Sequence, residues 1–390
     1  MANICKCLAV SAAICGVATG PALAMGLAYR VAYSFRAAGD GGMPAAGMVM
    51  DSTGALYGTT LAGGMGGSLT GHGTVFRFDP AREALTVLHQ FTPQDGNAPF
   101  GRLALGPNGH LYGTLALGGA QRCGSVYDLN TATLAYTTLF SFSCRLDGGK
   151  PLSGVVVDES GILYGETSAG GANAAGTIFS LNPVGHVMTV LHSFSGGAGG
   201  DGVGGQKLLV AGGALYGGTC VPGSGPGFVF KLAPATGAMQ IVYQFSGGAD
   251  GYCPGALVAG PGSTLFGATQ YSGGMEPPGG AIFKLDVTTG QLNVLHRFQS
   301  VEGSPPTDLT AGPGGNLFGA RRKGLFSPDG STFRLNSVTG AYRELDNLRA
   351  RKAFLVADPN PGLVVDGTAV YGTTATGGIA GQGSIFEIIQ

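Results

Sequence analysis

The chain has 390 residues, a formal net charge of −1 and only 11% charged residues. This balance leaves too few cations for the broad basic surface that nucleic-acid binding needs, so nucleic acid is excluded as a partner. The 74 glycines lie far above the usual share of about 7%. They fall at fixed offsets between apolar segments, which favours a folded repeat protein over a disordered chain.

The N-terminus has the pattern of a secretory signal. Lys6 precedes an apolar run over residues 7–17, and Ala22-Leu23-Ala24 supplies the small residues that precede a cleavage site. We predict a signal peptide at residues 1–24 and export to the periplasm, the cell surface or the medium. The run is shorter than the roughly 20 apolar residues of a membrane-spanning helix, so residues 25–390 are expected to form one domain without a transmembrane segment.

The tripeptide Leu56-Tyr57-Gly58 marks a repeat that runs through the whole chain. It recurs at a spacing of about 52 residues, and a fixed period in this range indicates a stacked or circular repeat architecture. The further copies are Leu111-Tyr112-Gly113, Leu163-Tyr164-Gly165, Leu215-Tyr216-Gly217, Leu265-Phe266-Gly267, Leu317-Phe318-Gly319 and Val370-Tyr371-Gly372.

Each repeat holds four short segments that run apolar or alternate between apolar and polar residues, as β-strands do. In the first repeat these are residues 47–50, 56–60, 73–76 and 87–91, separated by tight turns or glycine-rich loops. Antiparallel strands joined in this way need no helix. A parallel β-helix, the alternative, has much shorter rungs. The first six repeats span residues 45–91, 101–142, 153–194, 206–245, 255–298 and 307–348.

The two ends of the chain complete one another. Residues 31–35 match the fourth segment of a repeat that has no beginning, while the last repeat stops after its third segment at 383–389. Seven complete repeats exist only if residues 28–35 join residues 362–390. We therefore predict an all-β fold, a seven-bladed β-propeller of four-stranded antiparallel blades, with the ring closed by the N-terminal strand joining the C-terminal blade. The first segment should line the channel, and the fourth should lie outermost.

An acidic residue recurs in the loop that ends each repeat. We interpret these residues as turn formers whose carboxylates bond their own backbone, because seven turns around a ring lie too far apart to share a calcium ion. They are Asp40, Asp95, Asp147, Asp201, Asp250, Glu302 and Asp358.

At one position of the fourth segment, histidine interchanges with Phe140 and Tyr243, which indicates ring packing and not metal binding. The histidines at this position are His89, His192 and His296. No metal site, cofactor or catalytic residue is predicted.

Four cysteines lie beyond the signal peptide. The loops between the second and third strands, and the loops from each fourth strand to the next blade, emerge on one side of the propeller, which we call the top face. Cys123 and Cys144 lie in these two loops of blade two, and Cys220 and Cys253 hold the equivalent places in blade four. In an oxidising compartment this pattern predicts the disulfides Cys123–Cys144 and Cys220–Cys253, each stabilising the fold by about 3 kcal/mol.

Blade six carries the one local excess of basic residues, at the point where the repeat is least regular. Ala320-Arg321-Arg322 follows the tripeptide there, and more basic residues lie in the loop that leaves the blade. We predict a patch that binds an anionic ligand on the top face, and a solvated, divergent repeat is the alternative. The six residues are Arg321, Arg322, Lys323, Arg349, Arg351 and Lys352.

Four linked motifs resemble the GloVer tandem-repeat family over residues 30–390, namely Val-Leu-His-x-Phe, glycine-flanked Thr-Val-Phe, Asp-Gly-x-x-Pro and Leu-Tyr-Gly-Thr-Thr. The resemblance implies a bacterial exported or surface protein with this repeat architecture. It implies no activity and no catalytic residue. Family members carry differing anchors, and none is expected in this chain.

The expected function is that of an exported scaffold that binds a glycan or protein partner through its top-face loops, without catalysis. A glycan-active lyase or hydrolase that uses the same face is one alternative, and a purely structural surface protein is another. An anionic glycan or a surface protein is the expected partner of a monomeric chain. An enzyme would need polar side chains that converge at one break in the repeat.

Overall fold

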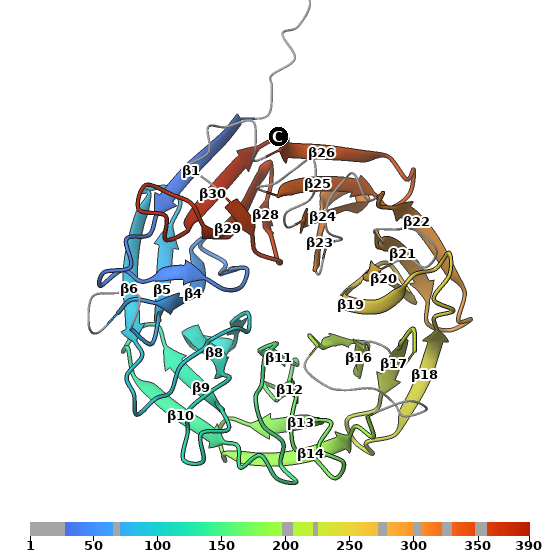
Figure 1. Cartoon of the computed structure of the whole chain (residues 1–390), viewed down its shortest axis with the longest axis horizontal. Coiled ribbons are helices and arrows are strands. Elements are labelled where there is room, and N and C mark those ends of the chain that lie inside the picture. Colours follow the sequence, from blue (N-terminus) through green and yellow to red (C-terminus); the bar gives the residue numbers. More distant parts are fainter. Residues whose placement is uncertain are drawn as a thin grey trace, which may run out of the picture.

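The computed structural model describes residues 28–64, 71–196, 206–220, 225–271, 279–299, 306, 308–321, 330–347 and 357–390. Its strands form seven antiparallel sheets, arranged as blades in a ring around a central channel (Figure 1). These ranges contain no α-helix. The prediction of a seven-bladed β-propeller is confirmed, while the predicted signal peptide, residues 1–24, lies outside the described residues.

Blade three shows the arrangement that the other blades repeat. Its strands β11 (Val155–Val157), β12 (Leu163–Thr167), β13 (Thr177–Asn182) and β14 (Val187–Ser193) pair in chain order. β11 lines the channel, and β14 lies on the outside of the ring (Figure 1). The predicted order of the four segments is confirmed.

The other blades follow the same order from the channel outward. Blades one and two consist of β3 (Val49–Met50), β4 (Leu56–Ala62), β5 (Thr74–Asp79) and β6 (Ala84–Gln90), then β7 (Ala104–Leu105), β8 (His110–Leu115), β9 (Ser125–Asn130) and β10 (Tyr136–Ser141). Blades four and five consist of β15 (Leu209–Ala211), β16 (Ala214–Gly218), β17 (Phe228–Leu232) and β18 (Met239–Gln244), then β19 (Tyr252–Ala259), β20 (Thr264–Tyr271), β21 (Ala281–Asp286) and β22 (Leu292–Arg297). Blade six holds β23 (Leu309–Gly312), β24 (Asn316–Arg321), β25 (Ser331–Asn336) and β26 (Tyr342–Asn347), and blade seven holds β28 (Val364–Asp366), β29 (Ala369–Thr376), β30 (Ser384–Ile389) and β1 (Ala28–Ser34). The described residues also contain two short 3-10 turns, η1 (Pro107–Gly109) and η3 (Pro313–Gly315).

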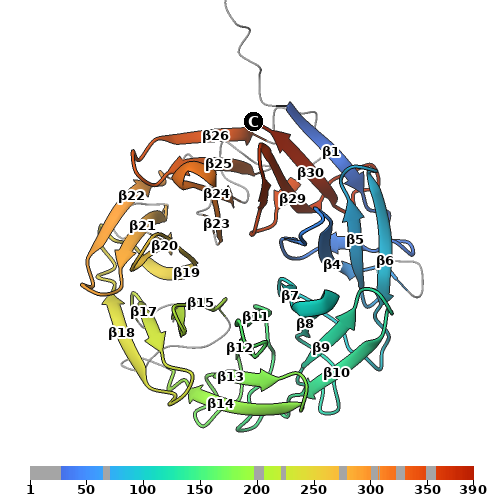
Figure 2. The ribbon, with the colours of Figure 1, turned by 180° about the vertical axis from the view of Figure 1, so that it is seen from behind.

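The ring closes on its N-terminal strand, as predicted. β1 pairs antiparallel with β30, from Ala28 opposite Ile389 to Ser34 opposite Ser384. Both views show β1 outside β30 and beside blade one (Figures 1 and 2). The first and last segments of the described chain therefore share one sheet.

The glycine of the Leu-Tyr-Gly motif is required by an aromatic ring on the neighbouring strand. A Cβ atom on Gly58 would lie 2.5 Å from Cζ of Phe76, and one on Gly165 would lie 2.6 Å from Cζ of Phe179. Each ring is fully buried and also packs against the adjacent blade, since Phe142 of blade two lies edge-on to Phe179 with centroids 5.3 Å apart. The core therefore consists of contacts between successive blades.

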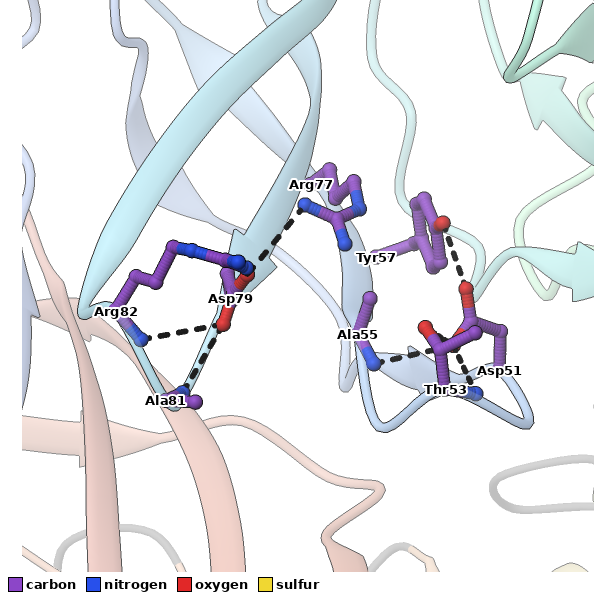
Figure 3. Close-up of polar contacts among 8 residues, drawn as sticks. All are labelled: Asp51, Thr53, Ala55, Tyr57, Arg77, Asp79, Ala81 and Arg82. Carbon is purple, nitrogen blue, oxygen red and sulfur yellow. Dashed lines mark hydrogen bonds and ion pairs between the residues drawn. The ribbon is translucent and has the colours of Figure 1, made fainter.

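The tyrosine of the motif is anchored to the turn that precedes it. In blade one, Oδ1 of Asp51 accepts hydrogen bonds from the backbone N–H groups of Thr53 at 2.8 Å and Ala55 at 3.1 Å (Figure 3). Oδ2 of the same carboxylate accepts a hydrogen bond from Oη of Tyr57 at 2.8 Å. Tyr164 makes the equivalent bond in blade three, to Asp158 at 3.0 Å.

The innermost strands extend farther than predicted. In blades one and seven, the segment before the first strand adds β2 (Gly42–Pro44) and β27 (Ala357–Pro359), which pair with β4 and β29. In blade five the same segment is continuous with β19, across a register shift between Pro254 and Leu257. A proline is tolerated here because the strand lies at the inner edge of its sheet, where the missing N–H has no partner to lose.

Candidate functional site

The top face carries two disulfide bonds. Cys123 is bonded to Cys144 and Cys220 to Cys253, with Cα–Cα distances of 5.4 and 4.5 Å. Both distances lie in the usual range for a disulfide, and both predicted pairings are confirmed. The first bond joins the loop after the second strand of blade two to the loop after its fourth strand, and the second joins the loop after β16 of blade four to the start of β19 in blade five.

Three exposed cations surround the disulfide of blade two. Arg122 directly precedes Cys123, and Arg145 directly follows Cys144. The backbone N–H of Lys150 donates to the carbonyl oxygen of Cys123 at 2.8 Å. We call Arg122, Arg145 and Lys150 the blade-two basic cluster. None of the three forms an ion pair with another residue of the described ranges.

The repeated backbone determines where two of these cations lie. Arg122 and Lys150 have φ angles of 57° and 53°, in the left-handed region that side chains other than glycine rarely adopt. The equivalent residues of neighbouring repeats, Ala174 and Ala98, have φ angles of 58° and 62°. The conformation, which costs about 1–3 kcal/mol per residue, therefore belongs to the repeat, and blade two places cations on it.

This cluster was not predicted from the sequence. The available signal was an arginine beside each cysteine of blade two, and at the position of Arg122 the next repeat has Ala174. The three residues are far enough apart in the sequence to look like ordinary scattered surface charges. Only the disulfide and the returning loop bring them together.

The predicted blade-six patch is described at one residue only. Arg321 ends β24 and is 2% exposed, with Nη2 3.3 Å from Oε1 of Glu344 and its guanidinium 5.3 Å from the centre of the Phe298 ring. Arg321 is buried between blades five and six and pairs with an exposed Glu344, which fits a structural role, so Arg321 is not a surface contact. The other five predicted residues lie outside the described residues, and they are Arg322, Lys323, Arg349, Arg351 and Lys352.

Three acidic residues of the inter-blade loops are turn formers, whereas Asp40 accepts a hydrogen bond from Oη of Tyr33 at 2.9 Å. The carboxylates of Asp95, Asp147 and Asp250 accept backbone N–H bonds from the residue three or four positions earlier, at 2.9, 2.9 and 2.7 Å. The prediction is confirmed for these three, while Asp201 and Glu302 lie outside the described residues. No group of three potential metal ligands occurs in the part of the chain that the structure describes.

The aromatic position of the fourth strand also reaches these acids, which the sequence analysis did not foresee. His89 stacks on Tyr136 with centroids 4.2 Å apart, as expected for a packing position, but its Nε2 also lies 3.2 Å from Oδ2 of Asp95. Tyr243 donates its hydroxyl to Asp250 at 3.1 Å in blade four. The strand and the loop that follows it are therefore linked by side chains as well as by the backbone.

A second group of charges lies in the central channel. Arg102, Lys207 and Asp308 lie one or two residues before the innermost strands of blades two, four and six, and we call them the channel triad. Nζ of Lys207 lies 3.1 Å from Oδ2 of Asp308, although the two residues come from non-adjacent blades. Nε of Arg102 donates to the backbone oxygen of Met48 at 2.8 Å. Burial lowers the pKa of Arg102, and the negative charge of Asp308 opposes this shift.

Three of the seven blades carry a charged residue just before the innermost strand, and a charged layer in the channel was not predicted. The four remaining blades have a small residue at the position of the triad, and these are Gly47, Gly154, Ala256 and Gly362. The signal was thus present as an alternation of charged and small residues around the ring. Their convergence depends on the closed ring and could not be seen in any single repeat.

The fold and these sites define a β-propeller repeat protein with a disulfide-bonded top face. The sequence matches the Gloeobacter/Verrucomicrobia repeat over residues 22–225 and 203–386, and the chain belongs to this family. The resemblance to the GloVer repeats is thereby confirmed. No curated protein matches the chain.

Two solved structures share the propeller fold at low sequence identity. An oligogalacturonate lyase from Vibrio parahaemolyticus has a TM-score of 0.60 and 10% identity, over 94% of this chain and 97% of the lyase. The GH74 xyloglucanase from Xanthomonas campestris has a TM-score of 0.59 and 13% identity, over 90% of this chain. This chain spans 52% of the length of the xyloglucanase. At these identities the likeness shows the fold alone.

The two disulfides fit an oxidising compartment. Among the described residues, no helix has the length and the apolar character to cross a membrane.

Proposed function

We propose that this protein is an exported, monomeric scaffold that binds an anionic glycan on its top face. The observation that carries the proposal is the blade-two basic cluster, in which Arg122, Arg145 and Lys150 are exposed around a disulfide and lack ion-pair partners in the described chain. Cations without internal partners are free to bond carboxylate groups of a ligand. Arginine suits this role because its planar guanidinium matches a carboxylate at two points.

The disulfide favours ligand binding because it reduces the conformational freedom that the two loops lose when the ligand binds. A flexible loop loses conformational freedom when it binds, and this loss weakens the complex. The bond between Cys123 and Cys144 links the two loops before any ligand arrives. The cations at Arg122 and Lys150 start from backbone positions that the repeat has already fixed.

A glycan is preferred over a protein partner for two reasons. The cluster consists of three cations, which suit a ligand that carries carboxylate groups, although Leu146 beside Arg145 is 72% exposed. Two propellers of similar fold are also named for carbohydrate substrates, one of them the anionic oligogalacturonate. Export is supported by the two disulfides and by the signal peptide that the sequence predicts at residues 1–24.

The test measures the affinity of the mature chain, residues 25–390, for polygalacturonate by calorimetry at low and at raised ionic strength. Replacing Arg122, Arg145 and Lys150 together by serine should weaken binding at least about tenfold, which corresponds to about 1.4 kcal/mol. Raised salt should weaken the native protein more than the variant, because fewer charges remain to be screened.

The matched control replaces three cations on strands three and four of blades four to six, which are Lys231, Lys284 and Arg343. This variant changes the net charge by the same amount and should keep its affinity. Equal weakening by the two triple variants would reject the site, and a lack of binding by the folded native protein would reject the function. Release of shortened sugars during the assay would instead indicate a lyase or hydrolase.

A further inference from the structure

The channel beside the triad is unusually apolar for a passage open to water. A cavity of about 470 Å³ runs along the innermost strands, within the range of about 300–1,000 Å³ that is typical of ligand sites. Apart from Arg102, Lys207 and Ser153, every residue that lines it is apolar. Blades one to six contribute, among others, Val49, Leu105, Val156, Leu209, Val258 and Ala311. Most of these side chains are only half-buried, so the free protein leaves apolar surface uncovered.

The channel triad separates this apolar shaft from the top face. A smaller cavity of about 170 Å³ lies on the other side and is lined by residues of the inter-blade loops such as Phe100, Leu152 and Pro361. The two cavities share Arg102, Ser153 and Lys207 as lining residues. The shaft therefore has an apolar wall and, at its top-face end, a layer of charged groups.

This charged layer has unused capacity to bind an anion. Among the described residues, Asp308 is the one carboxylate that acts on Arg102 and Lys207, so two cations and one carboxylate give the layer a formal charge of +1. Asp308 is 9% exposed and already accepts the backbone N–H of Leu309 at 2.9 Å, whereas Lys207 keeps 27% of its side chain exposed. Only Nε of Arg102 is used in a hydrogen bond to the described residues. The buried hydroxyl oxygen of Ser153 makes no hydrogen bond within the same part of the chain.

The glycine of blade seven leaves the space beside two charged groups of the triad free of a side chain. Gly362 of blade seven lies beside the triad, and a Cβ atom there would be 3.2 Å from Oδ2 of Asp308 and 3.5 Å from Nη1 of Arg102. A larger side chain at this position would crowd the two charged groups. At Gly47 and Gly154 the small residue is instead required by the backbone of a neighbouring blade, since a Cβ atom would lie 1.9 Å from the carbonyl oxygen of Gly362 and 2.4 Å from that of Arg102.

We propose that the central channel binds an aliphatic carboxylate, with its carboxylate group against Arg102 and Lys207 and its alkyl chain along the apolar shaft. Charge-assisted bonds from the two cations would neutralise the excess positive charge of the triad. The alkyl chain would cover half-exposed valine and leucine side chains, which yields about 25 cal/mol for each Å² of apolar surface removed from water. A purely structural ion network would explain the Lys207–Asp308 pair but not the excess charge or the apolar shaft.

This site is separate from the glycan site on the blade-two loops, and neither proposal depends on the other. The probe is octanoate, kept below its micelle concentration, and the mature chain is titrated by calorimetry. Octanoate should bind with a stoichiometry of one. Acetate lacks the alkyl chain, while octanol and octylammonium lack the carboxylate, so each should bind at least about tenfold more weakly.

Two substitutions test the two ends of the site. Lys207→Met removes one cation with little change of length and should weaken octanoate binding about tenfold or more. Ala311→Phe fills the shaft from an exposed position on β23 and should abolish octanoate binding while polygalacturonate binding persists. The matched control is Ala81→Phe, which places the same ring on an exposed hairpin and should have no effect on either ligand.

The proposal is overturned if the folded native chain does not bind octanoate, or if octylammonium binds as well as octanoate. It is also overturned if Ala311→Phe leaves the affinity unchanged. Thermal unfolding of every variant is recorded alongside, and a Lys207→Met protein that fails to fold is replaced by Lys207→Gln, for which the same loss is expected.

Discussion

Single side chains in this propeller act mainly by closing turns onto strands. Asp51 accepts hydrogen bonds from two backbone N–H groups, from the Thr53 hydroxyl at 2.6 Å and from Oη of Tyr57 (Figure 3). Burial alone would raise the pKa of this carboxyl, but the hydrogen bonds from Thr53 and Tyr57 outweigh it, and the pKa is lowered. The carboxylate is therefore an integral part of the β3–β4 turn.

Removing the Tyr57 hydroxyl tests this contact. Tyr57→Phe should lower the free energy of unfolding by about 1 kcal/mol, and Asp51→Ala by about 1–3 kcal/mol because several donors lose their acceptor. The control is Tyr112→Phe at the same repeat position, where the hydroxyl makes no hydrogen bond within the described residues, and it should change stability by less than about 0.5 kcal/mol. Urea unfolding at neutral pH measures all three. An equal loss for the two tyrosine variants would show that the Asp51 bond contributes nothing.

Hydrogen bonds between tyrosine hydroxyls and carboxylates also predict that the free energy of unfolding falls at alkaline pH. Burial, followed by the hydrogen bond to Asp158 and the charge of that carboxylate, raises the pKa of Tyr164 to about 12, and Tyr371 is raised to about 12 by burial and by Glu387. A group whose pKa is higher in the folded state stabilises the fold fully below the unfolded value of about 10. This contribution is lost as the pH rises from about 10 to about 12.

Tyr164→Phe isolates one of these groups. The difference in unfolding free energy between the native protein and this variant should be constant at neutral pH and should shrink between pH of about 10 and 12. Urea midpoints at a series of pH values measure the difference. If it stays constant across that window, the Tyr164–Asp158 bond does not govern the alkaline response.

At the scale of elements, both disulfides link top-face segments, but their surroundings differ in charge. They join residues separated by 21 and 33 positions, so opening either one should cost about 3–4 kcal/mol through the freer unfolded chain. Only the Cys123–Cys144 bond lies within a cluster of cations. Removing each disulfide in turn can therefore distinguish an effect on stability from an effect on ligand binding.

Replacing both cysteines of one pair by serine should lower the unfolding temperature for either pair. Only the Cys123→Ser, Cys144→Ser protein should also lose affinity for polygalacturonate, because its cations would sit on loops that are no longer linked. Calorimetric unfolding and the glycan titration measure the two effects. Equal losses of affinity in both double variants would show that the disulfide of blade two has no specific role in glycan binding.

For the whole molecule, features repeated along the chain could be predicted and features created by the ring could not. The period of Leu-Tyr-Gly determined the number of blades, and the unpaired fourth segment at residues 31–35 revealed the closure. The Lys207–Asp308 contact joins residues 101 positions apart, so no local spacing encodes it. Arg321 looked like a surface charge because its partner, Glu344, lies two strands away.

Closure of the ring by the N-terminal segment should make the unfolding of the blades cooperative. β1 provides the outermost strand of blade seven, and Phe35, which follows it, is fully buried and packs on Phe76 of blade one with centroids 5.3 Å apart. Arg30 bonds Glu387 within blade seven and Glu83 of blade one, so the segment joins two blades by charge as well as by packing.

A variant that lacks residues 1–35 should therefore lose more than about 4 kcal/mol of unfolding free energy, since a backbone ladder and a buried aromatic ring are lost together. Its thermal transition should also broaden, because an open array of blades unfolds less cooperatively than a closed ring. Adding a synthetic peptide of residues 28–36 should restore the midpoint in proportion to its concentration, as expected for a ligand that binds only the folded state. The same peptide with Val31→Pro cannot donate to the ladder at that residue and serves as the control. An unchanged midpoint without the segment would mean that the ring holds without its N-terminal strand.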